Sequence, residues 1–217
     1  ATGTYNTFIG ATAGDSMTVG DYNTALGYGA LNGVTTNDVQ GITAIGYGAL
    51  VGAAGTSTGA NYAVAVGMSA LSGLTTGGGN VAVGYQSGDA ITTTHSNTVV
   101  GHQALSAAAG NENTAMGRDA LAACTGAGNT SLGTYAGDVV TSGNYNTFSG
   151  YHADADVATD SYQTKIGSYG IVKYKTARVT LSNSYTGTPA EHDAAHDHAL
   201  FNIPSYSFIK KVWVKVI

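Results

Sequence analysis

The chain has 217 residues, of which 32 are glycine, and only 10% are charged, against about 25% in an ordinary globular domain. Residues 1–164 carry one base and ten acids, a formal charge of −9, whereas residues 165–217 carry seven bases and three acids, a charge of +4. So long an acidic stretch argues against a nucleic-acid surface, which needs cations for phosphate contacts. No apolar run reaches the ~18 residues of a membrane span, and Cys124 has no second cysteine with which to pair.

A five-residue phrase that ends in glycine recurs along the first three quarters of the chain. Its ten copies are NTFIG (6–10), NTALG (23–27), ITAIG (42–46), AVAVG (63–67), NVAVG (80–84), NTVVG (97–101), NTAMG (113–117), NTSLG (129–133), NTFSG (146–150) and QTKIG (163–167). Successive closing glycines lie 17, 19, 21, 17, 17, 16, 16, 17 and 17 residues apart. Such a period is typical of solenoids, whose coils stack because one coil cannot bury a core alone. Since residue 1 already falls inside the pattern, we expect a fragment or a processed chain.

The three residues before each closing glycine are named here the first, middle and third columns. Alternate residues of a strand share a face, so the first and third columns lie on one face and the middle column on the other. The first column is mostly Thr, the middle column mostly small, and the third column large and apolar except at Ser149. We expect the third column to form the core and the small middle column to admit another layer or chain. The predicted core residues are Ile9, Leu26, Ile45, Val66, Val83, Val100, Met116, Leu132 and Ile166.

The rest of each coil is also repeated. The closing glycines are predicted to turn the chain, and they are Gly10, Gly27, Gly46, Gly67, Gly84, Gly101, Gly117, Gly133, Gly150 and Gly167. After each glycine, x-x-Ala/Ser followed by Leu or Gly predicts a second short strand, so that a coil holds two strands and two turns. Asparagines at 6, 23, 80, 97, 113, 129 and 146 are predicted to form a hydrogen-bonded ladder along the stack.

Two features depart from or extend this pattern. Phe148-Ser149 exchanges the large and small positions, and Lys165 replaces the small middle residue, so we expect the packing to change near the end of the repeat. Tyrosines recur after the glycine and before the asparagine. They are predicted to stack between adjacent coils, although exposed tyrosine can also stack on sugars or contact a partner.

The phrases NTALG, NTAMG and NTSLG, each followed by x-x-Ala-Leu or a close variant, resemble the head repeats of trimeric autotransporter adhesins and repeats in bacteriophage tail fibres. The resemblance covers residues 1–167. It implies a left-handed parallel β-roll, or β-solenoid, of about ten coils, with three chains packed about a threefold axis. It also implies a non-enzymatic adhesive role, in a virion or outside the cell. The implied partners are two further copies of the chain, a host cell-surface glycan or protein, and other virion tail proteins.

The repeat ends near residue 167, and residues 168–217 are expected to form a short β-rich domain that is incomplete alone. Alternating residues in 170–182 predict a strand, and 200–217 predict one or two more. Between them, His196 and His198 have the spacing of the His-x-His pairs with which three chains of some phage tail fibres hold an axial iron. The resemblance thus implies iron or another transition metal on the threefold axis, beside the simpler interpretation of a solvated polar loop.

Other chemistry has weaker support. His152 beside Asp154 and Asp156 is the one crowded candidate for acid–base catalysis outside that loop, and Asp15, Asp89 and Asp138 suit turns better than calcium binding. A threonine ladder could bind ice, but Val64 and Val81 in the first column favour burial. We therefore expect no enzyme. The interpretations are a phage tail-fibre segment, the head of a bacterial trimeric adhesin, or a subunit of an extracellular filament, and a β-rich tail without heptads favours the first.

Overall fold

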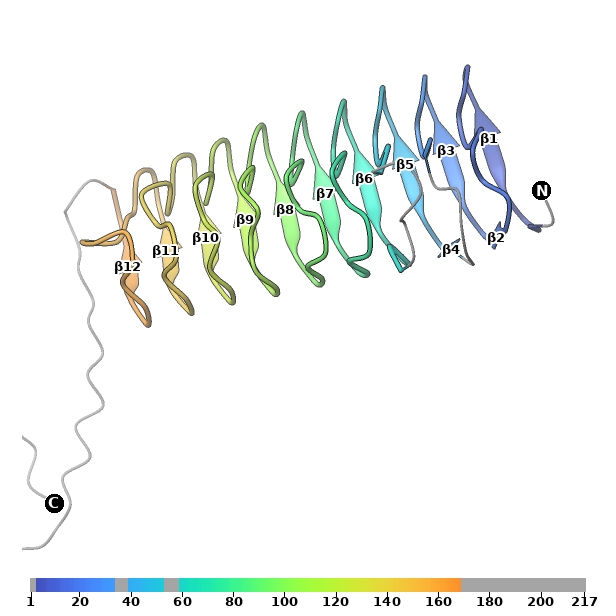
Figure 1. Ribbon diagram of the computed structural model, residues 1–217. Coiled ribbons are helices and arrows are strands. Elements are labelled where there is room, and N and C mark those ends of the chain that lie inside the picture. Colours follow the sequence, from blue (N-terminus) through green and yellow to red (C-terminus); the bar gives the residue numbers. More distant parts are fainter. Residues whose placement is uncertain (1–2, 34–38, 53–58, 169–217) are drawn as a thin grey trace, which may run out of the picture. The chain divides into compact units, whose positions relative to one another are not determined.

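A computed structural model describes residues 3–33, 39–52 and 59–168, which form a stack of coils (Figure 1). These residues are all-β, with parallel strands and no helix. They accordingly contain no helix of the length and apolarity that a membrane span requires. The predicted C-terminal domain, 168–217, lies outside the described residues except for Ser168.

The main sheet of the described residues has ten strands of three residues each, one from every copy of the repeated phrase. They are β1 (Thr7–Ile9), β3 (Thr24–Leu26), β5 (Thr43–Ile45), β6 (Val64–Val66), β7 (Val81–Val83), β8 (Thr98–Val100), β9 (Thr114–Met116), β10 (Thr130–Leu132), β11 (Thr147–Ser149) and β12 (Thr164–Ile166). A second, two-stranded sheet pairs β2 (Gly20–Asp21) with β4 (Val39–Gln40).

Each strand of the main sheet pairs in parallel with its counterpart in the next coil, so the strands lie side by side in chain order (Figure 1). The register joins equivalent residues, as in Leu26 with Ile45 and Ile45 with Val66. These pairs span the two longest intervals, so the extra residues are accommodated outside the strands. The predicted parallel β-solenoid is confirmed, and its ten strands are joined by about nine turns of the chain.

The predicted second strand of each coil is wrong for the described residues. The segment after the closing glycine is a series of turns, in which Gln103 and Leu105 have φ of 51° and 49°. A strand needs extended backbone with negative φ, so these left-handed positions interrupt it. The segment still bonds between coils, since Leu105 N donates to Ala120 O at 2.9 Å.

The interior of the coils is filled by the middle column and by side chains from the turn segment. The middle residues are fully buried from the second coil to the ninth, and they are Ala25, Ala44, Ala65, Ala82, Val99, Ala115, Ser131 and Phe148. They face a wall of buried residues from beyond the glycine, which includes Leu31, Leu50, Leu71, Leu74, Ile91, Leu105, Leu121 and Val140.

The predicted core is therefore wrong for the single chain, because the third column points outward. Its exposed members are Ile9, Leu26, Val83, Met116, Leu132 and Ile166, and its half-buried members are Ile45, Val66 and Val100. Alternation defines two faces of a strand but not which face is inside. The interior decides, because it is narrow: a Cβ added to Gly137 would lie 2.7 Å from Leu121 Cδ2 and 2.8 Å from Ser131 Oγ. In the coils with a wall leucine, the strand residue is no larger than valine.

The two phenylalanines of the middle column lie beside glycines of the wall. A Cβ on Gly14 would meet the Phe8 ring at 2.8 Å, and one on Gly137 would meet the Phe148 ring at 2.9 Å. Phe148 is fully buried and Ser149 takes the outward position. The expected change of packing at Phe148-Ser149 is thus local: a large strand residue packs against a glycine of the wall, and the parallel register is kept.

The predicted asparagine ladder is confirmed. Each buried asparagine accepts a bond from the backbone N–H of the equivalent residue in the next coil, as from Asn129 N to Asn113 Oδ1 at 2.9 Å. Its amide nitrogen donates to a backbone carbonyl, as from Asn113 Nδ2 to Gly126 O at 2.9 Å. Both halves of the buried amide are satisfied, which avoids the cost of an unpaired polar group.

The closing glycines have φ between 121° and 141°, a region that L-residues rarely adopt. They also stack directly on one another, since a Cβ on Gly117 would lie 2.4 Å from Gly133 O. Gly29, two residues after a closing glycine, is different. Its φ is 63°, the nearest atom to an added Cβ is 3.8 Å away, and Thr12, Ser69 and Gln86 occupy equivalent positions in other coils.

We predict that Gly117→Ala lowers the free energy of unfolding by more than about 3 kcal/mol, because the backbone must shift against the next coil. Gly29→Ala should cost about 1 kcal/mol, the usual penalty for a left-handed non-glycine residue. Urea unfolding followed by circular dichroism measures both. Equal losses in the two variants would contradict the stacking role of the closing glycines.

Candidate functional site

The outward side of the main sheet forms one continuous surface, named here the strand face. It consists of the first and third columns of the ten strands, with threonine or valine beside a mostly large aliphatic residue in every coil except that of Ser149. The strand face has no charged residue, although the described part of the chain is acidic. Lys165, the one charged residue of the main sheet, belongs to the middle column. An extended uncharged surface with a row of large aliphatic side chains is typical of a binding face.

Aromatic rings form short stacks at the edges of the coils. Tyr5 stacks on Tyr22 with ring centroids 5.0 Å apart, and Tyr28 stacks on Tyr47 at 5.4 Å. The predicted tyrosine stacking is confirmed at these pairs. Most of these tyrosines remain exposed, so their outer edges are also available to a sugar or a protein.

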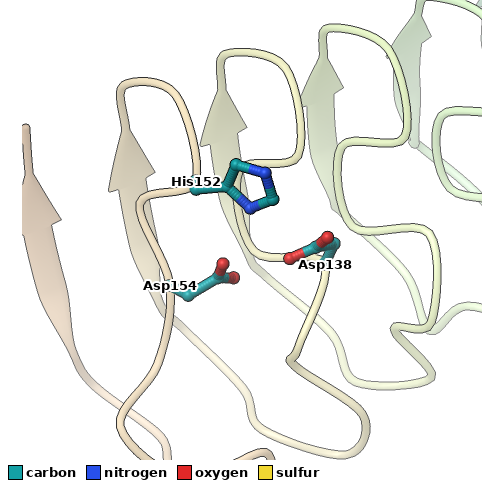
Figure 2. Close-up of side chains that lie close together, drawn as sticks. All are labelled: Asp138, His152 and Asp154. Atoms are coloured by element: carbon teal, nitrogen blue, oxygen red, sulfur yellow. The ribbon is translucent and has the colours of Figure 1, made fainter. Parts of the chain in front are cut away.

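A separate cluster gathers Asp138, His152 and Asp154, named here the Asp–His cluster. Asp138 comes from the turn segment between β10 and β11, and the other two come from the segment between β11 and β12. One ligand atom of each residue lies within 4.8 Å of the others. Figure 2 shows the imidazole above the two carboxylates, which face each other across adjacent coils. The stacking of coils therefore joins residues 14 and 16 positions apart.

Local contacts hold each member of the cluster. The His152 ring stacks on Tyr135 with centroids 4.6 Å apart and meets the Tyr151 ring edge to face at 4.5 Å. Asp154 Oδ1 accepts a bond from Val139 N at 3.3 Å. Asp138 Oδ1 is buried and has no hydrogen-bond partner.

The electrostatics of the cluster make Asp154 unusual. Burial, and then the neighbouring Asp138 carboxyl, raise the pKa of Asp154 from 3.8 to about 6, while the bond from Val139 N and His152 act in the opposite direction. Two carboxylates and an imidazole at this separation can share a proton or bind a cation.

The sequence placed His152 with Asp154 and Asp156, and the structure keeps only the first pair together. Asp156 pairs instead with Lys165, whose Nζ lies 3.0 Å from Asp156 Oδ1. Asp138, interpreted from the sequence as a turn residue, is the third member. The signal that could have revealed it was the 17-residue period, which sets Asp138 in the coil before His152. His196 and His198 lie outside the described residues.

The described part of the chain thus defines a parallel β-solenoid repeat protein with an exposed apolar strand face and one Asp–His cluster. Comparison with protein-family models, with curated proteins and with solved structures gives no match.

Asp154 should make the stability depend on pH. The pKa of Asp154 is about 6 in the folded chain, above the ordinary value of 3.8. Between about pH 4 and pH 6 the folded chain therefore binds more protons than the unfolded chain, so the free energy of unfolding falls as the pH rises through this range. Asp154→Asn keeps an oxygen for Val139 N and removes the charge. In a chelator-containing buffer, we expect this variant to melt higher than the wild type at pH 8 and to differ little at pH 4.

Asp15→Asn, in the exposed turn of the first coil, is the control and should show no such pH-dependent gain. Melting temperatures from circular dichroism at both pH values decide the matter. A gain for Asp154→Asn that is as large at pH 4 as at pH 8 would contradict the assignment.

Proposed function

We propose that this chain is a non-enzymatic, structural and adhesive segment of a trimeric bacteriophage tail fibre, and that it takes part in attachment to the host cell surface. The observation that carries the proposal is the strand face, a continuous apolar surface over about nine turns that a single chain leaves uncovered. We propose that two further copies of the same chain cover it, about a threefold axis, with the coils wound in the left-handed sense.

The periodicity of the strand face favours copies of this chain as its occupants. Its ridges repeat once per coil, at the ~4.8 Å spacing of hydrogen-bonded strands. A partner must have the same spacing to pack closely over the whole stack. Another copy of the chain has it, because its strands are stacked in the same way. The absence of charge from this face lets acidic chains approach each other there without direct repulsion.

The resemblance of the repeats to those of three-chain fibres and adhesin heads favours three copies over two. Three parallel solenoids joined along their strand faces would form a stiff projection that leaves the aromatic stacks outside. Several weak contacts to a surface glycan or protein would then act together, which raises avidity without stronger individual contacts. The other end of such a fibre would join further tail proteins of the virion.

Two alternative functions place the same repeat on a bacterial surface or in a filament instead of a virion. One is the head of a trimeric adhesin on a bacterial surface, and the other is a subunit of an extracellular filament. Antibodies raised against the purified chain and visualised by immunogold microscopy on the source material separate them. Label on virion tail fibres supports the proposal, label on the cell envelope supports the adhesin, and label on extracellular filaments supports the filament subunit. Label confined to the cell interior contradicts all three.

Light scattering should give a mass about three times the 21.7 kDa of one chain. Met116→Asp would bring three carboxylates together in the proposed interface, so we expect this variant to be monomeric at concentrations where the wild type is trimeric. Val19→Asp is the matched control, since Val19 is 42% exposed outside the strand face and Met116 is 40% exposed within it.

Circular dichroism of both variants checks that the coils remain folded. A monomeric wild-type chain would contradict the trimer. A trimer that survives Met116→Asp would show that another surface joins the chains.

A second candidate function, ice binding, concerns the same face. Thr24, Thr98 and Thr130 of the first column are exposed, and their strands stack in register, which removes the sequence-based argument that this column is buried. The two functions exclude each other, because a face covered by other chains cannot contact ice. Thermal hysteresis from a monomeric chain would favour ice binding, whereas a trimer without thermal hysteresis favours the fibre.

A further inference from the structure

The Asp–His cluster occurs where two variations of the repeat coincide. In three coils a Gly-Asp pair begins at the wall position, but the next coil differs each time at the second and fourth residues after its closing glycine. Those residues are Gly29 and Leu31 after Asp15, Gln103 and Leu105 after Asp89, and His152 and Asp154 after Asp138. Only the third Gly-Asp turn therefore meets an imidazole and a second carboxylate.

Asp154 is exceptional within its own column. The equivalent residue in each of the eight preceding coils is leucine or glycine with positive φ, as at Leu105 and Leu121, whereas Asp154 does not have positive φ. A buried apolar wall position is thus given to a carboxylate that points toward the Asp138 carboxylate (Figure 2). The buried Phe148 ring in the same coil accounts for the loss of leucine but not for the choice of aspartate, which brings two acids together in a half-buried place.

The three side chains are held at a separation suited to a metal ion. Their ligand atoms lie within 4.8 Å of one another, and the ligands of a tetrahedral zinc ion lie about 3.4 Å apart. Small side-chain rotations bridge the difference. The His152 ring is oriented by Tyr135, and Val139 N holds one oxygen of Asp154. Asp138 Oδ1, buried without a hydrogen-bond partner, is an acceptor that a cation would satisfy.

We propose that Asp138, His152 and Asp154 bind one divalent transition-metal ion of the zinc type, which links two adjacent coils. One imidazole and two carboxylates with a fourth position left to water suit Zn²⁺, whereas Ca²⁺ and Mg²⁺ prefer oxygen ligands alone. The ion neutralises two neighbouring acids and stabilises the contact between the coil that carries β10, with Asp138, and the coil that carries β11, with His152 and Asp154. Among the described residues, no other group of three His, Cys, Asp or Glu side chains has this geometry.

Zn²⁺ binding to the full untagged chain, freed of metal with a chelator, tests the proposal. His192, His196 and His198 are replaced by alanine throughout, so that these histidines do not contribute. Calorimetry should give about one Zn²⁺ per chain, Co²⁺ should give the visible absorption of a bound low-symmetry site, and Zn²⁺ should raise the melting temperature.

His152→Phe keeps an aromatic ring to stack on Tyr135 and removes the ligand nitrogen. His102→Phe is the matched control, because His102 stacks on Tyr85 in the same way, with centroids 5.0 Å apart, but has no carboxylate pair. We expect His152→Phe and Asp138→Asn each to weaken Zn²⁺ binding by about 100-fold or more, as loss of one of three ligands should, and His102→Phe to bind as the parent does.

Three outcomes overturn the proposal. They are a parent chain that takes up no Zn²⁺, binding that His152→Phe leaves unchanged, and equal loss of binding in His152→Phe and His102→Phe. The first would mean that the cluster is not a zinc site, and the other two would place the metal elsewhere. None of these results depends on the number of chains in the assembly.

Discussion

The width of the coil interior is the constraint on which the rest of this structure depends. Each coil encloses a single layer of side chains, in which the strand contributes one residue and the turn segment contributes the wall. Because leucine occupies most wall positions, the strand residue in the same coil is alanine or, in the coil of Leu105, valine, and phenylalanine enters only beside Gly14 and Gly137. The large residues of the strand are consequently outside. A chain with so little interior volume carries much of its apolar surface outward, which is why the strand face exists.

The sequence predicted the architecture of the described residues because a repeat of constant length can be recognised even where individual residues depart from the pattern. Ten copies at nearly constant spacing define parallel strands in register, whatever the individual side chains do. Which face of each strand points into the coil does not follow from the repeat. Thr24 and Leu26 share one face and Ala25 has the other in either orientation, so the periodicity alone could not say which side was the core. The deciding signal was the volume exchange of Phe8 with Gly14 and of Phe148 with Gly137, which requires knowing that these residues touch.

The second strand was predicted wrongly for a related reason. Residues such as Leu105, Leu121 and Tyr135 lie in the left-handed region, and nineteen non-glycine residues of the described chain do so. Each costs about 1–2 kcal/mol in isolation, and no propensity scale favours it. The conformation persists because the backbone groups at these positions bond to the neighbouring coil, as Tyr135 N does to Arg118 O at 2.9 Å. Local sequence preferences are therefore overruled by contacts that exist only in the stack.

The same stacking explains how a chemical site arises in a scaffold of repeats. Every column position places equivalent residues of neighbouring coils next to each other, so a single departure in one coil meets a predictable residue of the coil before it. His152 and Asp154 lie only two residues apart in the sequence, but Asp138 joins them only because the period carries it into contact. The sequence grouped His152 with Asp154 and Asp156, of which Asp156 lies nearer to His152 in the chain than Asp138 does but pairs with Lys165. In a solenoid, residues one period apart are closer neighbours than residues four apart, and sites should be sought across coils at positions where a structural column is broken.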